Sequence, residues 1–144
     1  MSLRKKLVIY THFSPDMQSR KTCAAQEQKV RDALGKMGID HSEAVVIHDK
    51  TGSGTKTFHD ALAEVVEMVE RKEIGILAVD NQARFMPADE TFAFITELVN
   101  SGGRFISTGD GTDTADSGWD LRVKMMALMY QTTIRNLRKR IRRS

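Results

Sequence analysis

The chain has 144 residues, one cysteine and a formal net charge of +3 at pH 7. A single cysteine excludes an internal disulfide, and no apolar run approaches the roughly 18 residues that a membrane span needs. The length suits one domain, and with an N-terminal apolar run too short for a signal peptide it predicts a cytoplasmic protein with no membrane contact.

Four short apolar runs rich in Val and Ile recur along the chain. They are LVIY (7–10), AVVI (44–47), IGILAV (74–79) and RFIS (104–107). Nearly continuous runs of this length are typical of strands that are buried on both faces of a parallel sheet. They predict an α/β fold, an open and mostly parallel sheet of four to five strands with helices on both faces.

Helical patterns lie between these runs. Apolar residues at spacings near 3.6 fall at Cys23, Val30, Leu34 and Met37, then within residues 58–69, and then within residues 92–99. These faces, Cys23 included, are expected to pack on the sheet. Gly38 and Gly102 follow the first and third patterns, where glycine commonly ends a helix.

A last helix is predicted over residues 119–143, which contain neither Gly nor Pro. It would extend about 37 Å at 1.5 Å per residue, farther than a small domain can cover. One apolar stripe comprises Val123, Met126, Tyr130, Ile134, Leu137 and Ile141, and a second group widens it at its start: Leu121, Met125, Leu128 and Met129. This pattern predicts burial first against the body of the domain and then against a second copy, which would make a homodimer. The alternative is a helix packed only on its own sheet.

Positive charge is concentrated at the end of this helix. Six of the 22 basic residues lie in residues 135–144, which hold no acid, so the rest of the chain carries 16 basic against 19 acidic side chains. The six are Arg135, Arg138, Lys139, Arg140, Arg142 and Arg143. Such a cluster favours contact with the phosphate backbone of double-stranded DNA, although a solvated terminus has the same composition.

Taken one at a time, the reactive residues give weak signals. Ser14 stands before Pro15, and His12 lies two residues earlier, where it could serve as a base for a serine nucleophile as in hydrolases. The segment DKTGSGTKT (49–57) lacks the spacing of a phosphate-binding loop, and the four histidines lack the spacing of metal ligands, so no metal is expected. Asp80 and Arg84 could form a surface ion pair.

In their order along the chain, the polar motifs resemble one family. The motifs are YTHFS (10–14), Gln18 and Gln26, Asp49 with Ser53 and Gly54, DNQAR (80–84), and DTADSG (113–118) before a long helix with a basic end. This pattern is similar to the N-terminal catalytic domain of the serine recombinases, the resolvase and invertase family, over residues 6–143. The resemblance implies a resolvase-like α/β catalytic domain over residues 1–118. Residues 119–144 would then be a helix for dimerisation and DNA backbone contact, and the chain would stop before a DNA-recognition module.

The resemblance also implies a reaction. In this family the serine at the position of Ser14 attacks a DNA phosphodiester and forms a 5′-phosphoserine intermediate, with no metal or other cofactor, in DNA recombination, strand exchange and integration. Arg84 would hold the phosphate, and Asp80 would orient the basic group or handle protons. The partners implied are double-stranded DNA and a homodimer that could form a tetramer on DNA, with a nucleoid-associated location.

The chain departs from the family pattern at several arginines. His12, His59 and Asn81 stand where the family has arginine, and Tyr130-Gln131 stands in place of a Glu-Arg pair. Histidine near phosphate could restore charge below about pH 6.5. Two alternatives therefore stay open: a catalytically impaired recombinase-fold module for DNA binding and dimerisation, and a small Ser/His hydrolase on a flavodoxin-like sheet.

Overall fold

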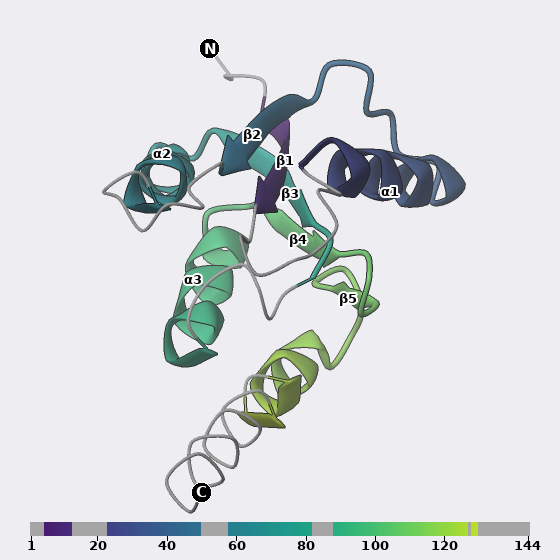
Figure 1. Ribbon diagram of the computed structural model, residues 1–144. Helices are drawn as coiled ribbons and strands as arrows, with labels where there is room; N and C mark the ends of the chain where they lie inside the picture. The colour runs from purple at the N-terminus through teal and green to yellow at the C-terminus, as the bar shows by residue number, and fades with distance from the viewer. Residues whose placement is uncertain (1–4, 13–22, 50–57, 82–87, 127, 130–144) are drawn as a thin grey trace, which may run out of the picture.

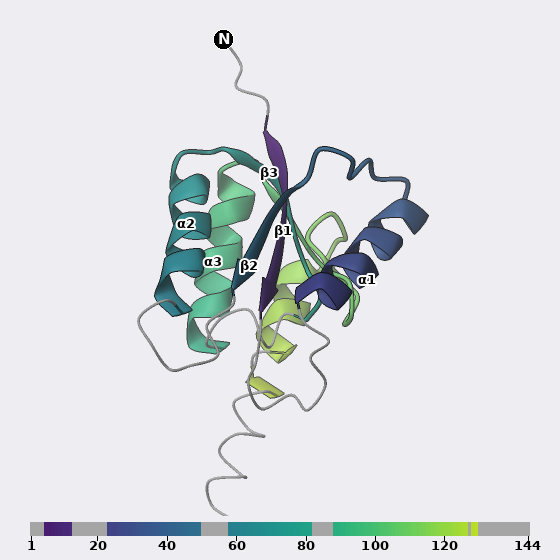
Figure 2. The ribbon, with the colours of Figure 1, turned by 45° about the horizontal axis from the view of Figure 1, so that its top comes forward.

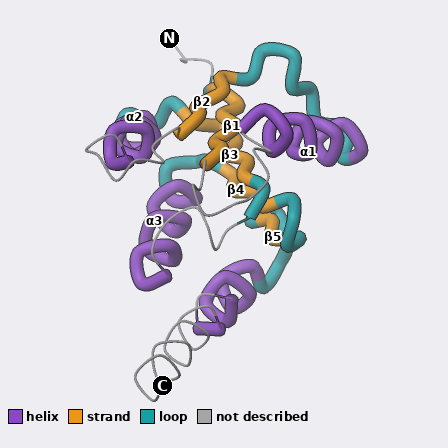
Figure 3. The backbone as a smooth tube through the Cα atoms, in the orientation of Figure 1, coloured by secondary structure: helices purple, strands orange, loops and turns teal. Residues whose placement is uncertain are grey.

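The computed structural model describes residues 5–12, 23–49, 58–81, 88–126 and 128–129, without the side chains of residues 12, 49, 58–60, 88 and 89. These residues form a five-stranded sheet with the order β2-β1-β3-β4-β5 (Figures 1 and 3). The strands are β1 (Lys6–His12), β2 (Val45–Asp49), β3 (Ile74–Val79), β4 (Arg104–Ser107) and β5 (Thr112–Asp113). The first four are parallel and β5 is antiparallel to β4. The predicted strands and the mostly parallel sheet are confirmed.

Helices cover both faces of the sheet (Figure 2). Helix α1 (Cys23–Lys36) lies on one face, and α2 (Phe58–Glu70) and α3 (Ala88–Asn100) lie on the other. Residues 119–126 and 128–129 are also helical and begin the predicted last helix. Within the described part of the chain, no helix has the length and apolar character needed to cross a bilayer.

The two faces of the sheet bury separate apolar clusters. Val8 and Tyr10 of β1 join the larger cluster with α2 and α3, whereas Ile9 between them joins the smaller cluster with α1. This alternation follows from the period of two in a strand. Val123 of the last helix is fully buried in the larger cluster, so the start of that helix is part of the domain.

The turns after α1, α2 and α3 share one hydrogen-bond pattern. After α1, Gly38 N donates to Gly35 O at 3.1 Å and Ile39 N donates to Leu34 O at 2.9 Å. This pair of bonds defines a Schellman motif, in which one residue adopts a left-handed conformation. That residue is Gly38 after α1, Lys72 after α2 and Gly102 after α3, with φ of 78°, 58° and 90°. The two predicted glycine ends are confirmed.

Two packing predictions are wrong. Met37 is 43% exposed, because α1 ends at Lys36 and Met37 belongs to the cap. The group Leu121, Met125, Leu128 and Met129 is between 53% and 66% exposed, so it does not pack against the body of the domain. At 3.6 residues per turn these four residues lie on the side of the helix opposite Val123, which is the side that the body contacts.

Candidate active site

The carboxyl ends of the parallel strands meet at one edge of the sheet (Figure 2). Tyr10 of β1 pairs with Ile47 of β2 and with Val79, the last residue of β3, and β1 and β2 continue for two more residues, to His12 and Asp49. The strand order changes direction at β1, since β2 lies on one side of β1 and β3 on the other. In open α/β sheets ligands bind beyond the carboxyl ends at such a switch point. The edge between β1 and β3 is therefore the candidate site.

Asp80, which directly follows β3, has a closely fixed backbone. Gly109 N donates to the Asp80 carbonyl at 2.6 Å, and Thr108 N donates to Val79 O at 2.9 Å. A Cβ at Gly109 would overlap the Asp80 carbonyl oxygen and come within 3.2 Å of its Oδ1. The half-buried Asp80 carboxylate thus lies against the turn between β4 and β5.

The turn between β4 and β5 connects this edge to the last helix. Ser107 Oγ donates to Asp110 Oδ2 at 2.8 Å, and Thr112 N donates to Asp110 Oδ1 at 3.1 Å. Arg122 Nη2 then donates to the Asp110 carbonyl at 2.6 Å. The run TGDGT (108–112) carries the turn residues that could have predicted this loop. Its contact with Arg122 depends on the docking of the helix, which no local pattern reveals.

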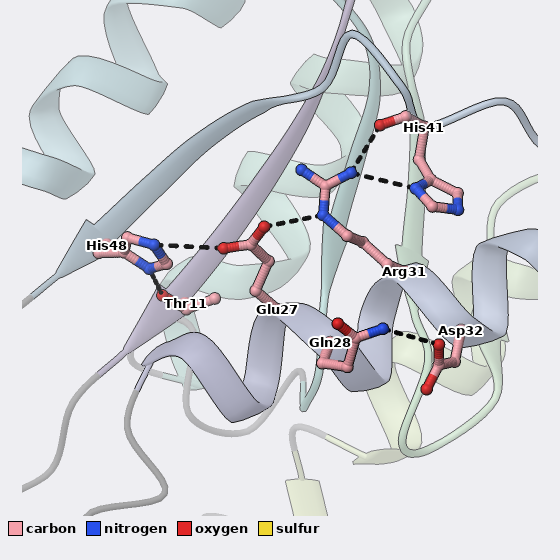
Figure 4. Close-up of polar contacts among 7 residues, drawn as sticks. All are labelled: Thr11, Glu27, Gln28, Arg31, Asp32, His41 and His48. Carbon is pink, nitrogen blue, oxygen red and sulfur yellow. Dashed lines mark hydrogen bonds and ion pairs between the residues drawn. The ribbon is translucent and has the colours of Figure 1, made fainter.

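A second polar group at this edge was not predicted. Thr11 of β1 and His48 of β2 are paired in register, and Thr11 Oγ1 lies 2.7 Å from His48 Nδ1. His48 Nε2 lies 3.4 Å from Oε1 of Glu27, which projects from α1 (Figure 4). The sequence pattern gives His48 no role, since the four histidines lack the spacing of metal ligands. The alternation of β2 places it on the α1 face, but only the packing of α1 supplies Glu27.

Several predicted site residues lie outside the described residues. They are Ser14, Arg84, Arg135, Arg138, Lys139, Arg140, Arg142 and Arg143, together with Tyr130 and Gln131. The structure places only the backbones of two others: His12 ends β1 opposite Asp49, and His59 is the second residue of α2. Among the described side chains, no group of three or more His, Cys, Asp and Glu is arranged to hold a metal ion.

A strong ion pair joins β4 to β5. Arg104 donates from Nε to Asp113 Oδ1 at 2.8 Å and from Nη2 to Asp113 Oδ2 at 2.6 Å. These hydrogen bonds lower the pKa of Asp113 and raise the pKa of Arg104. The pair has a structural role, because it fixes a two-residue strand that carries no apolar run of its own.

Comparisons with known proteins identify the family and the fold. The family model described as "Resolvase, N terminal domain" matches residues 7–144. The N-terminal catalytic domain of TP901-1 integrase superimposes with a TM-score of 0.66 at 20% identity, covering 92% of this chain and 98% of that one. A resolvase family site-specific recombinase from Streptococcus pneumoniae gives a TM-score of 0.64 at 17% identity, covering 96% and 91%. No curated protein sequence matches the chain.

The family model spans the sheet, its three covering helices and the last helix, and the two solved structures share this fold. The predicted family and fold are confirmed. The chain belongs to the resolvase family of serine recombinases and carries the N-terminal domain of that family.

Proposed function

We propose that this domain cleaves and exchanges DNA strands as part of a site-specific recombinase, with Ser14 as the nucleophile. The observation that supports this function is the pairing of Tyr10 with Val79 at the switch point. Ser14 follows Tyr10 by four residues and Arg84 follows Val79 by five. Because five extended residues span at most about 18 Å, both side chains can reach one phosphate from neighbouring strand ends.

In the proposed reaction, Ser14 Oγ attacks the phosphorus of a DNA phosphodiester. The Oγ–P bond forms and the bond from phosphorus to the 3′ oxygen breaks, which leaves a 5′-phosphoserine and a free 3′-hydroxyl. The serine loses its proton and the 3′ oxygen gains one, so the net charge is unchanged. The covalent intermediate retains the phosphodiester energy, so rejoining needs no nucleotide cofactor.

The transition state gathers negative charge on the nonbridging phosphate oxygens, and fixed cations lower its free energy. Arg84 is proposed to supply this charge, with His12 and His59 contributing when they are protonated. Asp80, whose backbone is held by Gly109, is proposed to orient the basic group or to handle protons.

A second candidate is a catalytically impaired module that keeps DNA binding and dimerisation. The replacements at His12, His59, Asn81 and Gln131 favour it, because the loss of a single electrostatic donor commonly raises a barrier by about 3–4 kcal/mol. The hydrolase alternative loses its basis, because the chain belongs to the resolvase family.

A covalent-capture experiment separates these candidates. The protein is incubated with a nicked duplex library of random sequence across roughly pH 5 to 8, a range that includes histidine protonation. The recombinase proposal predicts a denaturant-resistant protein–DNA adduct that Ser14→Ala cannot form and Ser19→Ala still forms. If wild-type protein binds the library but yields no adduct at any pH, the impaired module is the correct function.

The proposed partners are DNA and a second copy of the chain. The proposed location of the protein is the nucleoid. The exposed face formed by Leu121, Met125, Leu128 and Met129, here called the apolar helix face, supports a homodimer, and tetramer formation on DNA would follow from it. The six basic residues of the C-terminal segment support contact with phosphates, which gives affinity and register but little sequence specificity.

A further inference from the structure

The contact between Thr11 and His48 belongs to a longer line of polar side chains that crosses from the sheet to α1 (Figure 4). It runs from Thr11 Oγ1 to His48 Nδ1 at 2.7 Å and from His48 Nε2 to Glu27 Oε1 at 3.4 Å. Thr11, at the end of this line in the sheet, is buried, with 1% of its surface exposed. The line therefore connects a buried hydroxyl of β1 to a carboxylate on a separate element.

The partners of His48 determine the direction of its hydrogen bonds. An ionised Glu27 carboxylate can only accept, so it favours a proton on His48 Nε2. In the neutral ring Nδ1 is then the acceptor, and the Thr11 hydroxyl donates to it. The Thr11 side chain is thus held in one orientation by a ring that the carboxylate has oriented.

Glu27 is itself fixed from the other side. Its Oε2 accepts from Arg31 Nε at 2.7 Å, and Arg31 Nη1 donates to the His41 carbonyl at 2.7 Å. Both contacts lie on the side of α1 that faces His48 (Figure 4). The neighbouring Gln28–Asp32 pair, with Nε2 2.9 Å from Oδ1, is exposed and projects away from this line.

This arrangement is placed where β1 needs support. The pairing of β1 with β3 ends at Tyr10, so the carboxyl end of β1 beyond Tyr10 is paired on one side only, by β2. Thr11 is the last described buried side chain of β1, and Ser14 follows three residues later. Valine would fill the same space as threonine without burying a polar group, so the hydroxyl adds orientation rather than packing.

We propose that His48 is a positioning residue for the transesterification proposed above, and this inference rests on that function. Oriented by Glu27, His48 fixes Thr11 and so sets the end of the strand from which Ser14 follows. Reactions of this kind are sensitive to such placement, because a shift of about 1 Å can lower a rate by roughly 100-fold.

The test measures the single-turnover rate of adduct formation on the nicked library, with the dissociation constant for the same duplex and the melting temperature measured alongside. Thr11→Val and His48→Leu are expected to lower the rate by about 10- to 100-fold while the dissociation constant changes by less than about twofold. Thr11→Ser keeps the hydroxyl and should restore most of the rate. Glu27→Gln should also slow the reaction. Its matched control is the neighbouring variant Gln28→Ala, which should react at the wild-type rate.

A ring ¹⁵N NMR spectrum gives a signature that simple destabilisation does not produce. In the wild type, the neutral His48 ring should show a protonated Nε2 and an acceptor Nδ1, and Thr11→Val should shift the Nδ1 resonance. Reaction of Thr11→Val and His48→Leu at the wild-type rate would overturn the positioning role. So would a rate loss that tracks the melting temperature and that Thr11→Ser does not repair. A wild-type protein that forms no adduct removes the proposed function, and the positioning role with it, and is distinguished by the inactivity of the wild type itself.

Discussion

Lys72 occupies a backbone conformation that L-residues with a side chain adopt at a cost. The turns after α1 and α3 use glycine at the equivalent position, whereas the turn after α2 places Lys72 at φ 58°. The left-handed conformation costs a residue with a Cβ roughly 1–2 kcal/mol, a cost that glycine does not have. Glycine loses more conformational entropy on folding, so a change to glycine recovers only part of this free energy.

Lys72→Gly is therefore expected to raise the free energy of unfolding by about 0.5–1 kcal/mol. Gly38→Ala is the matched control with the opposite sign, because a Cβ at Gly38 meets nothing within 4 Å and tests only the backbone conformation. Urea unfolding at constant m value measures both changes. Equal stability of the two variants and the wild type would contradict the role given to this conformation.

The Arg104–Asp113 pair predicts a loss of stability in acid. Hydrogen bonds from Arg104 lower the pKa of Asp113 from 3.8, so their contribution is present above about pH 4 and is lost as the pH falls through the lower folded-state pKa. Since Arg104 is 34% exposed, the contribution is about 1 kcal/mol after screening by solvent. Asp113→Asn should unfold more easily than wild type at neutral pH, and this difference should shrink below about pH 3.5. The exposed carboxylate variant Glu64→Gln should show neither effect.

At the scale of elements, the last helix presents two different faces. Val123 is buried in the core, while the apolar helix face on the opposite side is exposed in the single chain. A cluster of exposed apolar side chains on a protein surface commonly marks an interface with another protein.

Replacing Met125 and Leu128 together by glutamate should convert a dimer to a monomer, because each copy would bring two charges into the contact. Analytical ultracentrifugation over a range of protein concentrations measures this change. Ala24→Glu on the exposed side of α1 is the control and should leave the association unchanged. A wild-type protein that sediments as a monomer at every concentration would contradict the dimer.

The elements show where sequence patterns are sufficient. Short apolar runs predicted β3 and β4 to the residue, since buried parallel strands are continuous in hydrophobicity. Strand β5 has only two residues, and the tertiary ion pair of Asp113 with Arg104 holds it, so no local pattern could predict it. The pattern predicted that the apolar helix face packs on the body, whereas its residues are exposed on the side of the helix opposite the buried Val123.

At the scale of the whole molecule, charge separates along the chain, with an acidic body and a basic C-terminal segment. Each phosphate contact releases counterions, so the logarithm of the DNA association constant should fall steeply with the logarithm of salt concentration.

Changing the five basic residues within 138–143 to glutamine is expected to lower that slope by up to roughly four and to weaken binding to any duplex sequence. The control changes three exposed basic residues of the helices, Lys29, Lys36 and Arg71, to glutamine and should leave the slope nearly unchanged. Fluorescence anisotropy with a duplex of arbitrary sequence gives both values. Equal slopes for the two variants would exclude the basic segment as the DNA contact.

The sequence predicted which strand ends lie together at the candidate site, but not the contacts that support them. The order of strands and motifs located Asp80 and the end of β1 at one edge, because parallel strands must bring their carboxyl ends together. The contacts of Asp80 with Gly109, and of His48 with Glu27, join residues that are far apart in the sequence. They arise only when the turn and α1 dock on the sheet.

The three Schellman turns lie at the edge of the sheet opposite the candidate site, because each helix runs back against the strand direction. The turns that stabilise the helices and the residues proposed for the reaction thus lie at opposite ends of the domain. A stabilising change such as Lys72→Gly could therefore be made there without touching the residues that would meet DNA. The trade-off between rigidity and turnover that constrains many enzymes should therefore be weak in this domain.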